Sequence, residues 1–322
     1  MLRRRPDFSC GGGVLLSVDL SVTIAGVKFR NPVIAASGTF GYGSEYAGLL
    51  DIAALGGICT KGLTLTPRPG NTGVRIHETP SGLMNSIGLE NPGIPAFIEK
   101  ELPQLRNLGP VVIANLSGFD VVEYAEGAML LNACAIDMIE LNISCPNVKT
   151  GGMAFGLDPE TAAAVTGAVR KAAPYKPLMV KLSPNAPDLA AVASACVNAG
   201  ADALSLVNTF TALAIDIQNR CPLFDNITAG LSGPAIKPIA LRMVWDLWKV
   251  LQKKKQAVPI VGLGGIVSAE DALEFLMAGA AAVQAGSVTF THPPAMNKII
   301  AGIAAYMKER DLSRIAELSI HI

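Results

Sequence analysis

The sequence has few aromatic residues, few charged residues and no excess of charge of either sign. Aromatic residues make up 5% of its 322 residues and charged residues 16%, and the 26 Lys and Arg balance the 26 Asp and Glu. This balance argues against a surface that binds nucleic acid or a membrane. Half of the residues are hydrophobic, and most of these are aliphatic. Such a composition is typical of parallel strands that are covered on both faces and read as continuous aliphatic runs.

A long uninterrupted hydrophobic run is also missing, although the mean hydropathy is +0.41. The longest uncharged stretch, 275–297, contains Gln284, His292, a Pro-Pro pair and a break at Gly279. A membrane-spanning helix needs about 20 predominantly apolar residues. We therefore interpret this stretch as a helix end, a buried strand and a loop.

Clustered cysteines are absent as well. The six cysteines are Cys10, Cys59, Cys134, Cys145, Cys196 and Cys221, and no two of them form a CxxC motif. The spacing therefore predicts no zinc or iron–sulfur site, and no metal site of any other kind is indicated. It is more typical of a reduced, cytoplasmic protein than of a disulfide framework.

The N-terminal segment 1–17, "MLRRRPDFSCGGGVLLS", only loosely imitates a signal peptide. Its apolar part is short and interrupted by three glycines, and it has no clear small-residue cleavage site. We interpret it as a disordered extension, or as the result of a start codon placed too far upstream. Residues 18–322 are expected to form a single domain.

One pattern repeats along the chain: a short aliphatic run, a polar or Gly-rich break and a segment compatible with a helix. Eight such runs occur, at 32–38, 56–62, 111–118, 138–145, 177–184, 203–209, 259–265 and 282–287. Eight strands alternating with helices over this length predict a (β/α)₈ TIM barrel. The alternating segment 20–32 carries a Gly turn and predicts a small hairpin that closes the barrel bottom.

Three of the intervening segments carry signals for helices. Segments 158–173 and 187–199 each have an acidic residue early, where it suits a helix start. Segment 268–278 opens with Ser268 as a predicted N-cap, carries Asp271 three residues later and ends before Gly279. The long gap at 63–110 is rich in Pro and Gly, and we interpret it as a functional loop.

Polar residues or glycines follow all eight predicted strands. They are Ser37, Lys61, Asn115, Asn142 with Cys145, Lys181, Asn208, Gly264 with Gly265, and Gly286 with Ser287. In a barrel these positions meet at the C-terminal face, where active sites lie. Caps and turns explain some of them, but not Lys61 and Lys181, because lysine is almost never buried without a partner. The pattern predicts a large polar ligand site.

The ends of the last two strands indicate a phosphate. Barrel phosphate sites form after strands seven and eight, from backbone N–H groups and the N-terminus of a short helix. Gly264, Gly265, Gly286 and Ser287 fit that arrangement, which suits a flavin mononucleotide or a sugar phosphate equally well. A Rossmann dinucleotide fingerprint is absent, because its glycine spacing and acidic partner are missing.

Four asparagines narrow the ligand further. Asn85, Asn142, Asn147 and Asn208 each offer an amide acceptor and two donors. A flat ring with alternating C=O and N–H groups needs such partners on several sides. A carboxylate on the ring would need a cation, and Lys61 is the nearest candidate.

Cys145 leaves three interpretations open at this stage. It can be a small buried residue at a strand end, a metal ligand or a group that does chemistry. No cluster of further ligands supports the metal.

Several motifs together resemble class 1 dihydroorotate dehydrogenases. They are "ELNISCPNVKTGGMAFGLDPE", "CTKGLTL", "NSIGLENPG", "VKLSPN", "VNT", "GLSGPAIKP" and "GLGGI". The resemblance covers roughly residues 18–310. The segment "SCPNVKTGGMAFG" is similar to subclass B, the NAD-linked catalytic subunit.

The resemblance implies an FMN cofactor, one per chain, and a mechanism. The expected FMN-binding residues are Ser37, Lys61, Gly62, Asn115, Asn142, Lys181, Val207, Gly233, Gly264, Gly265, Gly286 and Ser287. The expected substrate-binding residues are Lys61, Asn85, Ser86, Ile87, Gly88, Leu89, Asn142, Asn147, Asn208 and Thr209. Cys145 is expected to act as the base in the oxidation of (S)-dihydroorotate to orotate, a step of de novo pyrimidine (UMP) biosynthesis.

The same resemblance implies partners. A separate subunit with FAD and a [2Fe-2S] cluster is expected to carry electrons to NAD⁺, in a heterotetramer of two catalytic and two electron-transfer chains. The alternatives are a fumarate-linked subclass A homodimer, an FMN-dependent tRNA dihydrouridine synthase and a non-catalytic binding or assembly subunit. A tRNA enzyme should show a basic face, which the zero net charge disfavours.

Overall fold

The computed structural model describes residues 18–143, 155–318 and 320. The hypothesis about residues 1–17 and the roles expected of Cys145 and Asn147 lie outside the described residues. Among the helices that are described, none is both long and apolar enough to cross a membrane.

Eight parallel strands close into a barrel, in the spatial order β10-β15-β16-β3-β4-β7-β8-β9. The strands are β3 (Val33–Ala35), β4 (Gly57–Cys59), β7 (Val111–Leu116), β8 (Met138–Asn142), β9 (Leu178–Lys181), β10 (Ala203–Leu206), β15 (Ile260–Leu263) and β16 (Ala282–Ala285). Each lies within one of the eight predicted aliphatic runs. The prediction of a (β/α)₈ barrel is therefore confirmed.

Helices surround the barrel, and three of them begin near the starts that the sequence signals predicted. They are α1 (Ile94–Ala96), α2 (Leu102–Asn107), α3 (Val121–Asn132), α4 (Pro159–Ala172), α5 (Leu189–Asn198), α6 (Lys237–Lys254), α7 (Ala269–Met277), α8 (Val288–Thr291) and α9 (Ala295–Glu309). Short turns of other helix types lie at η1 (Ser44–Tyr46), η2 (Ile52–Ala54), η3 (Phe97–Glu101), η4 (Pro234–Ile236) and η5 (Ile315–Glu317).

The predicted caps form. Asp158 and Asp188 accept hydrogen bonds from backbone N–H groups of the first turns of α4 and α5. Ser268 and Asp271 form a complete capping box at the start of α7. Gly279 follows the end of that helix with a φ of +100°, and a Cβ there would lie 2.4 Å from the ring of Trp248. Both the conformation and the space therefore require glycine at this helix end.

A hairpin of β1 (Val22–Ile24) and β2 (Val27–Phe29) closes the bottom of the barrel. Its buried residues Ile24 and Phe29 join a cluster with the inward residues Ile34, Ile113 and Met138 near the strand starts. The predicted bottom hairpin is therefore confirmed. Its apolar contacts seal the end of the barrel opposite the C-terminal face.

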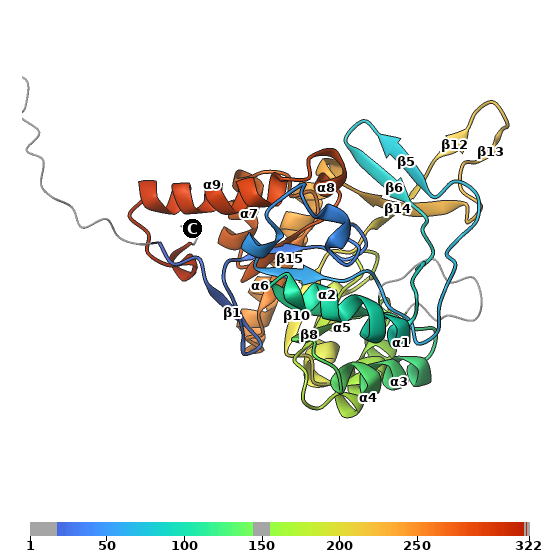
Figure 1. The fold of residues 1–322 in the computed structure, drawn as a ribbon, viewed down its shortest axis with the longest axis horizontal. Helices are drawn as coiled ribbons and strands as arrows, with labels where there is room; N and C mark the ends of the chain where they lie inside the picture. Colours follow the sequence, from blue (N-terminus) through green and yellow to red (C-terminus); the bar gives the residue numbers. More distant parts are fainter. Residues whose placement is uncertain (1–17, 144–154, 319, 321–322) are drawn as a thin grey trace, which may run out of the picture.

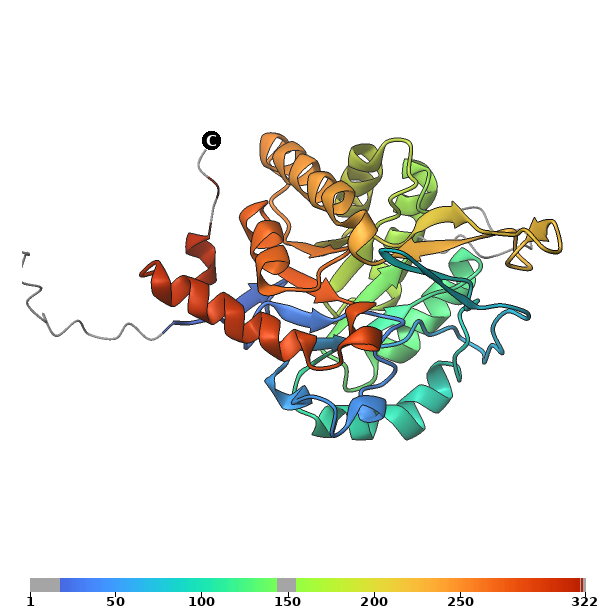
Figure 2. The same cartoon turned by 90° about the horizontal axis from the view of Figure 1, so that it is seen from above.

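A second sheet projects from the barrel and was not predicted. It has the antiparallel order β11 (Phe210–Leu213), β14 (Thr228–Ser232), β6 (Gly82–Asn85) and β5 (Ile76–Thr79). A small ladder of β12 (Ile215–Asp216) and β13 (Cys221–Pro222) follows β11. Figures 1 and 2 both show this accessory sheet on the side of the molecule away from the β1–β2 hairpin. The gap at 63–110, which we interpreted as a loop, thus supplies two strands of this sheet and the helices α1 and α2.

Candidate functional site

A pocket opens at the C-terminal ends of the barrel strands and is walled on one side by the accessory sheet. It brings together most of the residues that the sequence singled out. Those that line it are Ser37, Lys61, Gly62, Asn85, Ile87, Gly88, Leu89, Asn115, Asn142, Lys181, Val207, Asn208, Thr209, Gly233, Gly264, Gly265, Gly286 and Ser287. They come from all eight barrel strands or the loops after them, and from strand β6 of the accessory sheet and the loops after β6 and β14.

Of the expected residues that the structure describes, Ser86 does not line the pocket. Ser86 is buried behind the wall, where its hydroxyl accepts hydrogen bonds from Asn71 Nδ2 at 3.1 Å and Asn226 Nδ2 at 3.2 Å. Its side chain therefore faces away from the pocket, because two amides from other loops hold it there. Cys145 and Asn147 lie outside the described residues, beyond the end of β8.

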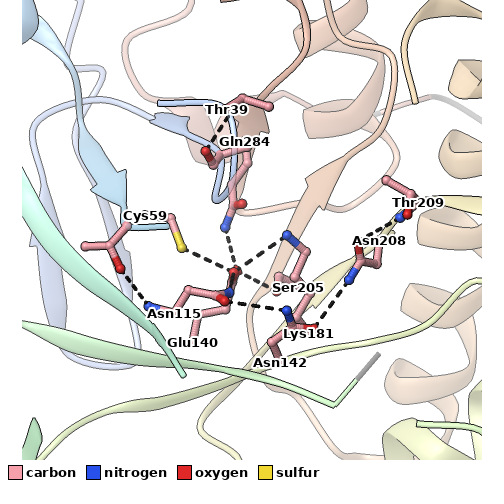
Figure 3. A network of polar contacts seen from close by, with 12 residues as sticks. Thr39, Cys59, Asn115, Glu140, Asn142, Lys181, Ser205, Asn208, Thr209 and Gln284 are labelled. Atoms are coloured by element: carbon pink, nitrogen blue, oxygen red, sulfur yellow. Dashed lines mark hydrogen bonds and ion pairs between the residues drawn. The ribbon is translucent and has the colours of Figure 1, made fainter. Parts of the chain in front are cut away.

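The pocket floor rests on a buried carboxylate, that of Glu140 in β8. Five side chains converge on it (Figure 3). Oε1 accepts from Asn115 Nδ2 at 2.7 Å and from Cys59 Sγ at 3.2 Å, and it lies 3.7 Å from Lys181 Nζ. Oε2 accepts from Gln284 Nε2 at 2.7 Å and from Ser205 Oγ at 2.9 Å. Lys181 is itself almost fully buried, so Glu140 is the counter-ion that allows a lysine to lie under the pocket.

The surroundings of Glu140 decide its charge. Burial alone would raise the pKa of this carboxyl, but the charge of Lys181 and the hydrogen bonds from Gln284, Cys59 and Ser205 outweigh burial and lower the pKa below its ordinary value. The opposite holds for Cys59, because burial and the neighbouring carboxylate raise the pKa of its thiol well above the ordinary value. The site therefore holds an ionised Glu140 and a neutral Cys59.

A row of side-chain amides crosses the floor from this carboxylate. Asn142 Nδ2 lies 3.5 Å from Asn115 Oδ1, and Asn208 Nδ2 lies 3.3 Å from Asn142 Oδ1. The backbone N–H of Thr209 donates to Asn208 Oδ1 at 2.8 Å. The row thus runs from β7 through β8 to the loop after β10. It offers amide groups to a ligand along one edge of the pocket.

Lys61 supplies a second cation, nearer the opening. Its side chain is 29% exposed, and its Nζ lies 3.9 Å from Glu90 Oε2. Glu90 is bound more closely by Arg75, at 2.8 Å. Lys61 therefore keeps its charge available to an anion in the pocket.

The far end of the pocket is built from glycines after β14, β15 and β16. Gly233, Gly264 and Gly265 have φ values of +101°, +133° and +75°. A Cβ at Gly265 would lie 2.8 Å from the carbonyl oxygen of Gly233, so the two loops pack backbone against backbone. The short helix α8 begins directly after Gly286 and Ser287. This is the arrangement expected of a barrel phosphate site.

Several pocket features were missed at the level of sequence. Glu140, Ser205 and Gln284 are buried polar residues inside strands that were interpreted only as aliphatic runs. A signal was available, because Glu140 lies two residues before Asn142 and therefore faces the same side of β8. The remaining lining residues that were missed are Ala36, Gly38, Thr39, Ile76, Leu83, Ser232, Ile236, Leu263, Ile266 and Phe290.

The described residues contain no group of three or more His, Cys, Asp or Glu side chains that could hold a metal ion. The charged side chains among the lining residues are those of Lys61 and Lys181.

Comparisons with known proteins agree with this site. The family model described as dihydroorotate dehydrogenase matches residues 19–307. The dihydroorotate dehydrogenase B (NAD(+)) catalytic subunit of Petrotoga mobilis is 57% identical, over 94% of this chain and 98% of its own length. The proteins of the same name from Geotalea daltonii and Caldicellulosiruptor saccharolyticus are 55% and 52% identical, over 93% and 94% of this chain and 97% and 98% of their own lengths. The resemblance found in the sequence is therefore confirmed, and the chain belongs to the dihydroorotate dehydrogenase family.

Proposed function

We propose that this chain oxidises (S)-dihydroorotate to orotate in pyrimidine biosynthesis, as the catalytic subunit of an NAD⁺-linked enzyme. The observation that carries the proposal is the buried Lys181–Glu140 pair beneath a pocket edged by asparagines. A flat, anionic, amide-rich ring is the ligand that such a pocket suits. The names of the relatives supply the substrate and the acceptor.

The pocket fits a flavin mononucleotide. The glycine loops at its far end suit the phosphate, and the apolar side chains of Val207, Ile236 and Leu263 suit the faces of a fused ring. Gln284 lines the pocket, and its Oε1 is buried without a hydrogen-bond partner in the described part of the chain. A buried acceptor of this kind calls for a donor, and the N–H group of the flavin ring is one.

The chain's own residues would hold this cofactor in distinct ways. Gly233, Gly264, Gly265, Gly286 and Ser287 would bind the phosphate through backbone N–H groups. Lys181 would place a cation beside the ring, where it stabilises negative charge. The contacts of Ser37, Lys61, Gly62, Asn115, Asn142 and Val207 complete the proposed shell. A bound flavin would supply the chemistry of accepting the hydride that dihydroorotate loses.

The substrate would lie against the wall made by the accessory sheet. Lys61 would pair with its carboxylate, and Asn85, Asn142 and Asn208 would bind the C=O and N–H groups of its ring. The segment from Ile87 to Leu89 would cover one edge. We retain Ser86 as a contact only through its backbone, because its side chain faces Asn71 and Asn226.

Cys145 is the proposed base that removes the proton from C5 of the ring, and Asn147 is a proposed substrate contact. Cys145 follows three residues after Asn142, which lines the pocket. A thiol has a pKa of about 8.5 in water, and only its thiolate form accepts the proton. The rate of substrate oxidation should therefore rise with pH through the pKa of Cys145.

Electrons would leave the flavin through a separate subunit with FAD and a [2Fe-2S] cluster, in a cytoplasmic assembly of two catalytic and two electron-transfer chains. The term "catalytic subunit" in the names of the relatives supports such a partner. The free cysteines described in this chain are isolated from one another, and the proposal puts the cluster on the partner for that reason.

The test is anaerobic reduction of the FMN-loaded chain by (S)-dihydroorotate, followed by its flavin absorption. We expect rapid bleaching with this substrate and none with the (R) enantiomer as control. Failure to bind FMN, or bleaching at equal rates by both enantiomers, would contradict the proposal.

The electron acceptor is tested separately. The chain purified with its co-expressed partner should reduce NAD⁺, while the chain alone should reduce neither NAD⁺ nor fumarate efficiently. Efficient turnover of the isolated chain with fumarate would instead indicate the subclass A enzyme.

A further inference from the structure

Glu140 does not line the pocket, but it is connected, directly or through one residue, to four residues that do. Asn115, Lys181 and Gln284 line the pocket and contact the Glu140 carboxylate directly. Asn142 lines it too and is reached through Asn115. A single buried side chain is therefore connected to most of the polar groups on the pocket floor.

An ionised carboxylate can only accept hydrogen bonds. Asn115 must therefore present its NH₂ group to Glu140, and its Oδ1 is left to face Asn142. Asn142 must then donate to Asn115, which turns its own Oδ1 toward Asn208. Asn208 in turn donates to Asn142 and accepts from the N–H of Thr209. The direction of each amide follows from the one before it, starting from the carboxylate.

The same logic applies to Gln284. Its Nε2 donates to Glu140 Oε2 at 2.7 Å, so its Oε1 must point elsewhere. That oxygen is buried and has no partner in the described part of the chain. Glu140 thus determines that Gln284 shows the pocket an acceptor and not a donor.

We propose that Glu140 is a positioning residue that fixes the donor and acceptor pattern of the pocket floor by orienting Asn115, Asn142, Asn208 and Gln284. It also holds the ammonium group of Lys181 under the pocket. Which ring groups this pattern recognises rests on the proposed function. The role of Glu140 in creating the pattern is independent of the proposed function, because this role follows from contacts within this chain.

The test variant is Glu140→Gln, which keeps the shape of the side chain. A glutamine at this position has one acceptor oxygen and one NH₂ group, whereas the surrounding donors need acceptors on both sides. At least one of the two amides that donate to Glu140, that of Asn115 or that of Gln284, must therefore turn or lose its partner. The matched control is Ser205→Ala, which removes one hydrogen bond to the same carboxylate and leaves the row of amides in place.

The first measurement is the dissociation constant of orotate for the FMN-loaded protein, read from the flavin absorption. We expect Glu140→Gln to raise it about tenfold, the effect of one lost or misdirected hydrogen bond. Ser205→Ala should leave it close to the wild-type value, and Glu140→Asp should give an intermediate value. Equal effects of Glu140→Gln and Ser205→Ala would overturn the proposal, because they would indicate a role in stability alone.

The second measurement is the midpoint potential of the bound FMN. Removing the negative charge beside Lys181 should raise the potential in Glu140→Gln, while Ser205→Ala should not change it. An unchanged potential in Glu140→Gln would overturn the proposal. This measurement needs no substrate. If the wild-type protein bound FMN but not orotate, the proposed function would be contradicted. The role of Glu140 could still be tested through the potential of the bound FMN.

If Glu140→Gln does not fold, Glu140→Asp carries the test. Its carboxylate is one methylene group shorter and cannot reach all of the donors that surround Glu140. We then expect weaker orotate binding than in Ser205→Ala, and equal binding would overturn the proposal.

Discussion

The lower and upper halves of the barrel interior are built from the same strands but from different chemistry. The lower layer consists of Ile34, Cys59, Ile113, Met138, Met179, Ala203, Val261 and Ala282, and it packs on the β1–β2 hairpin. Two residues further along the chain, in the strand or directly after it, are Ala36, Lys61, Asn115, Glu140, Lys181, Ser205, Leu263 and Gln284. Side chains of a strand alternate between its two faces, so both sets point inward.

In most strands, the next inward-facing side chain, two residues further along, is thus polar instead of apolar. Only Ala36 and Leu263 keep the upper layer apolar. Burying polar groups costs free energy unless they are paired, so the upper layer depends on its internal hydrogen bonds, as the shell of Glu140 illustrates. The lower layer gains stability mainly from burial, and Cys59 adds a hydrogen bond to Glu140. We therefore expect substitutions in the two layers to affect different properties.

The largest effect is expected at Cys145, the proposed base. Cys145→Ala should retain FMN but lower the rate of flavin reduction by dihydroorotate about 10²–10⁴-fold, the usual contribution of a catalytic base. Stopped-flow absorption measures this rate, and Cys134→Ala, a cysteine away from the pocket, is the control. Reduction at the wild-type rate, or a rate in the wild type that stays flat from about pH 6 to pH 10, would show that Cys145 is not the base.

The next effect is expected in the lower layer. Ile113→Ala removes a fully buried side chain and should lower the free energy of unfolding by about 2–5 kcal/mol. Urea unfolding measures it, and Ile113→Val should cost roughly 0.5–1.5 kcal/mol. The folded variant should still bind FMN and reduce it at the wild-type rate. A slower reduction of FMN in the folded variant would show that the lower layer affects activity as well as stability.

A smaller effect is expected at Lys61, at the pocket opening. Lys61→Met should raise the KM for dihydroorotate about 10- to 100-fold through the loss of a charged hydrogen bond. The change in the free energy of unfolding should be slight, because the lysine is partly exposed. Arg75→Met is the matched control, since Arg75 pairs with the same Glu90 but does not line the pocket. Equal KM values for the two variants would show that Lys61 does not bind the substrate.

The smallest effect is expected outside the barrel, in the capping box of α7. Burial alone would raise the pKa of the Asp271 carboxyl, but Lys237 and the backbone N–H groups of Val267 and Ser268 outweigh it and lower the pKa. A native-state pKa below the unfolded value of about 3.9 means that this stabilisation is complete above about pH 4. It is lost as the pH falls through the lower, native-state pKa.

Asp271→Asn should therefore lower the free energy of unfolding by about 1 kcal/mol at neutral pH, and the difference from the wild type should shrink below about pH 4. Urea unfolding at several pH values measures this. Glu160→Gln, in the first turn of α4, is the control and should show a smaller change. A difference that stays constant down to about pH 3 would contradict the assigned role of the carboxylate.

The sequence predicted the barrel well because its signals are local. Aliphatic runs mark the strands, and Asp158, Asp188 and Ser268 mark helix starts through contacts within three residues. The accessory sheet was missed for the opposite reason. Its strands β6 and β14 pair with each other although they lie far apart in the sequence. Both segments are short and partly exposed, and their polar and apolar residues do not clearly alternate.

Most of the residues that line the pocket were predicted, but the buried Glu140 beneath them was not. Strand ends reveal which residues reach the C-terminal face, and most of those predicted do line the pocket. Glu140 was missed because its partners Asn115, Ser205 and Gln284 come from three other strands. Only the closed barrel brings these four residues together. The direction of Ser86 likewise depends on amides from two distant loops.

The pairing of β6 with β14 also has a consequence for the newly made chain. Asn85 at the end of β6 donates to the carbonyl of Gly230 in β14 at 3.2 Å, and the two residues are 145 positions apart. At a translation rate of about 5–20 residues per second, β14 follows β6 out of the ribosome after roughly 7–30 s. During that interval the wall of the pocket lacks half of its strands. The binding site therefore becomes complete only late in synthesis, after most of the barrel has been made.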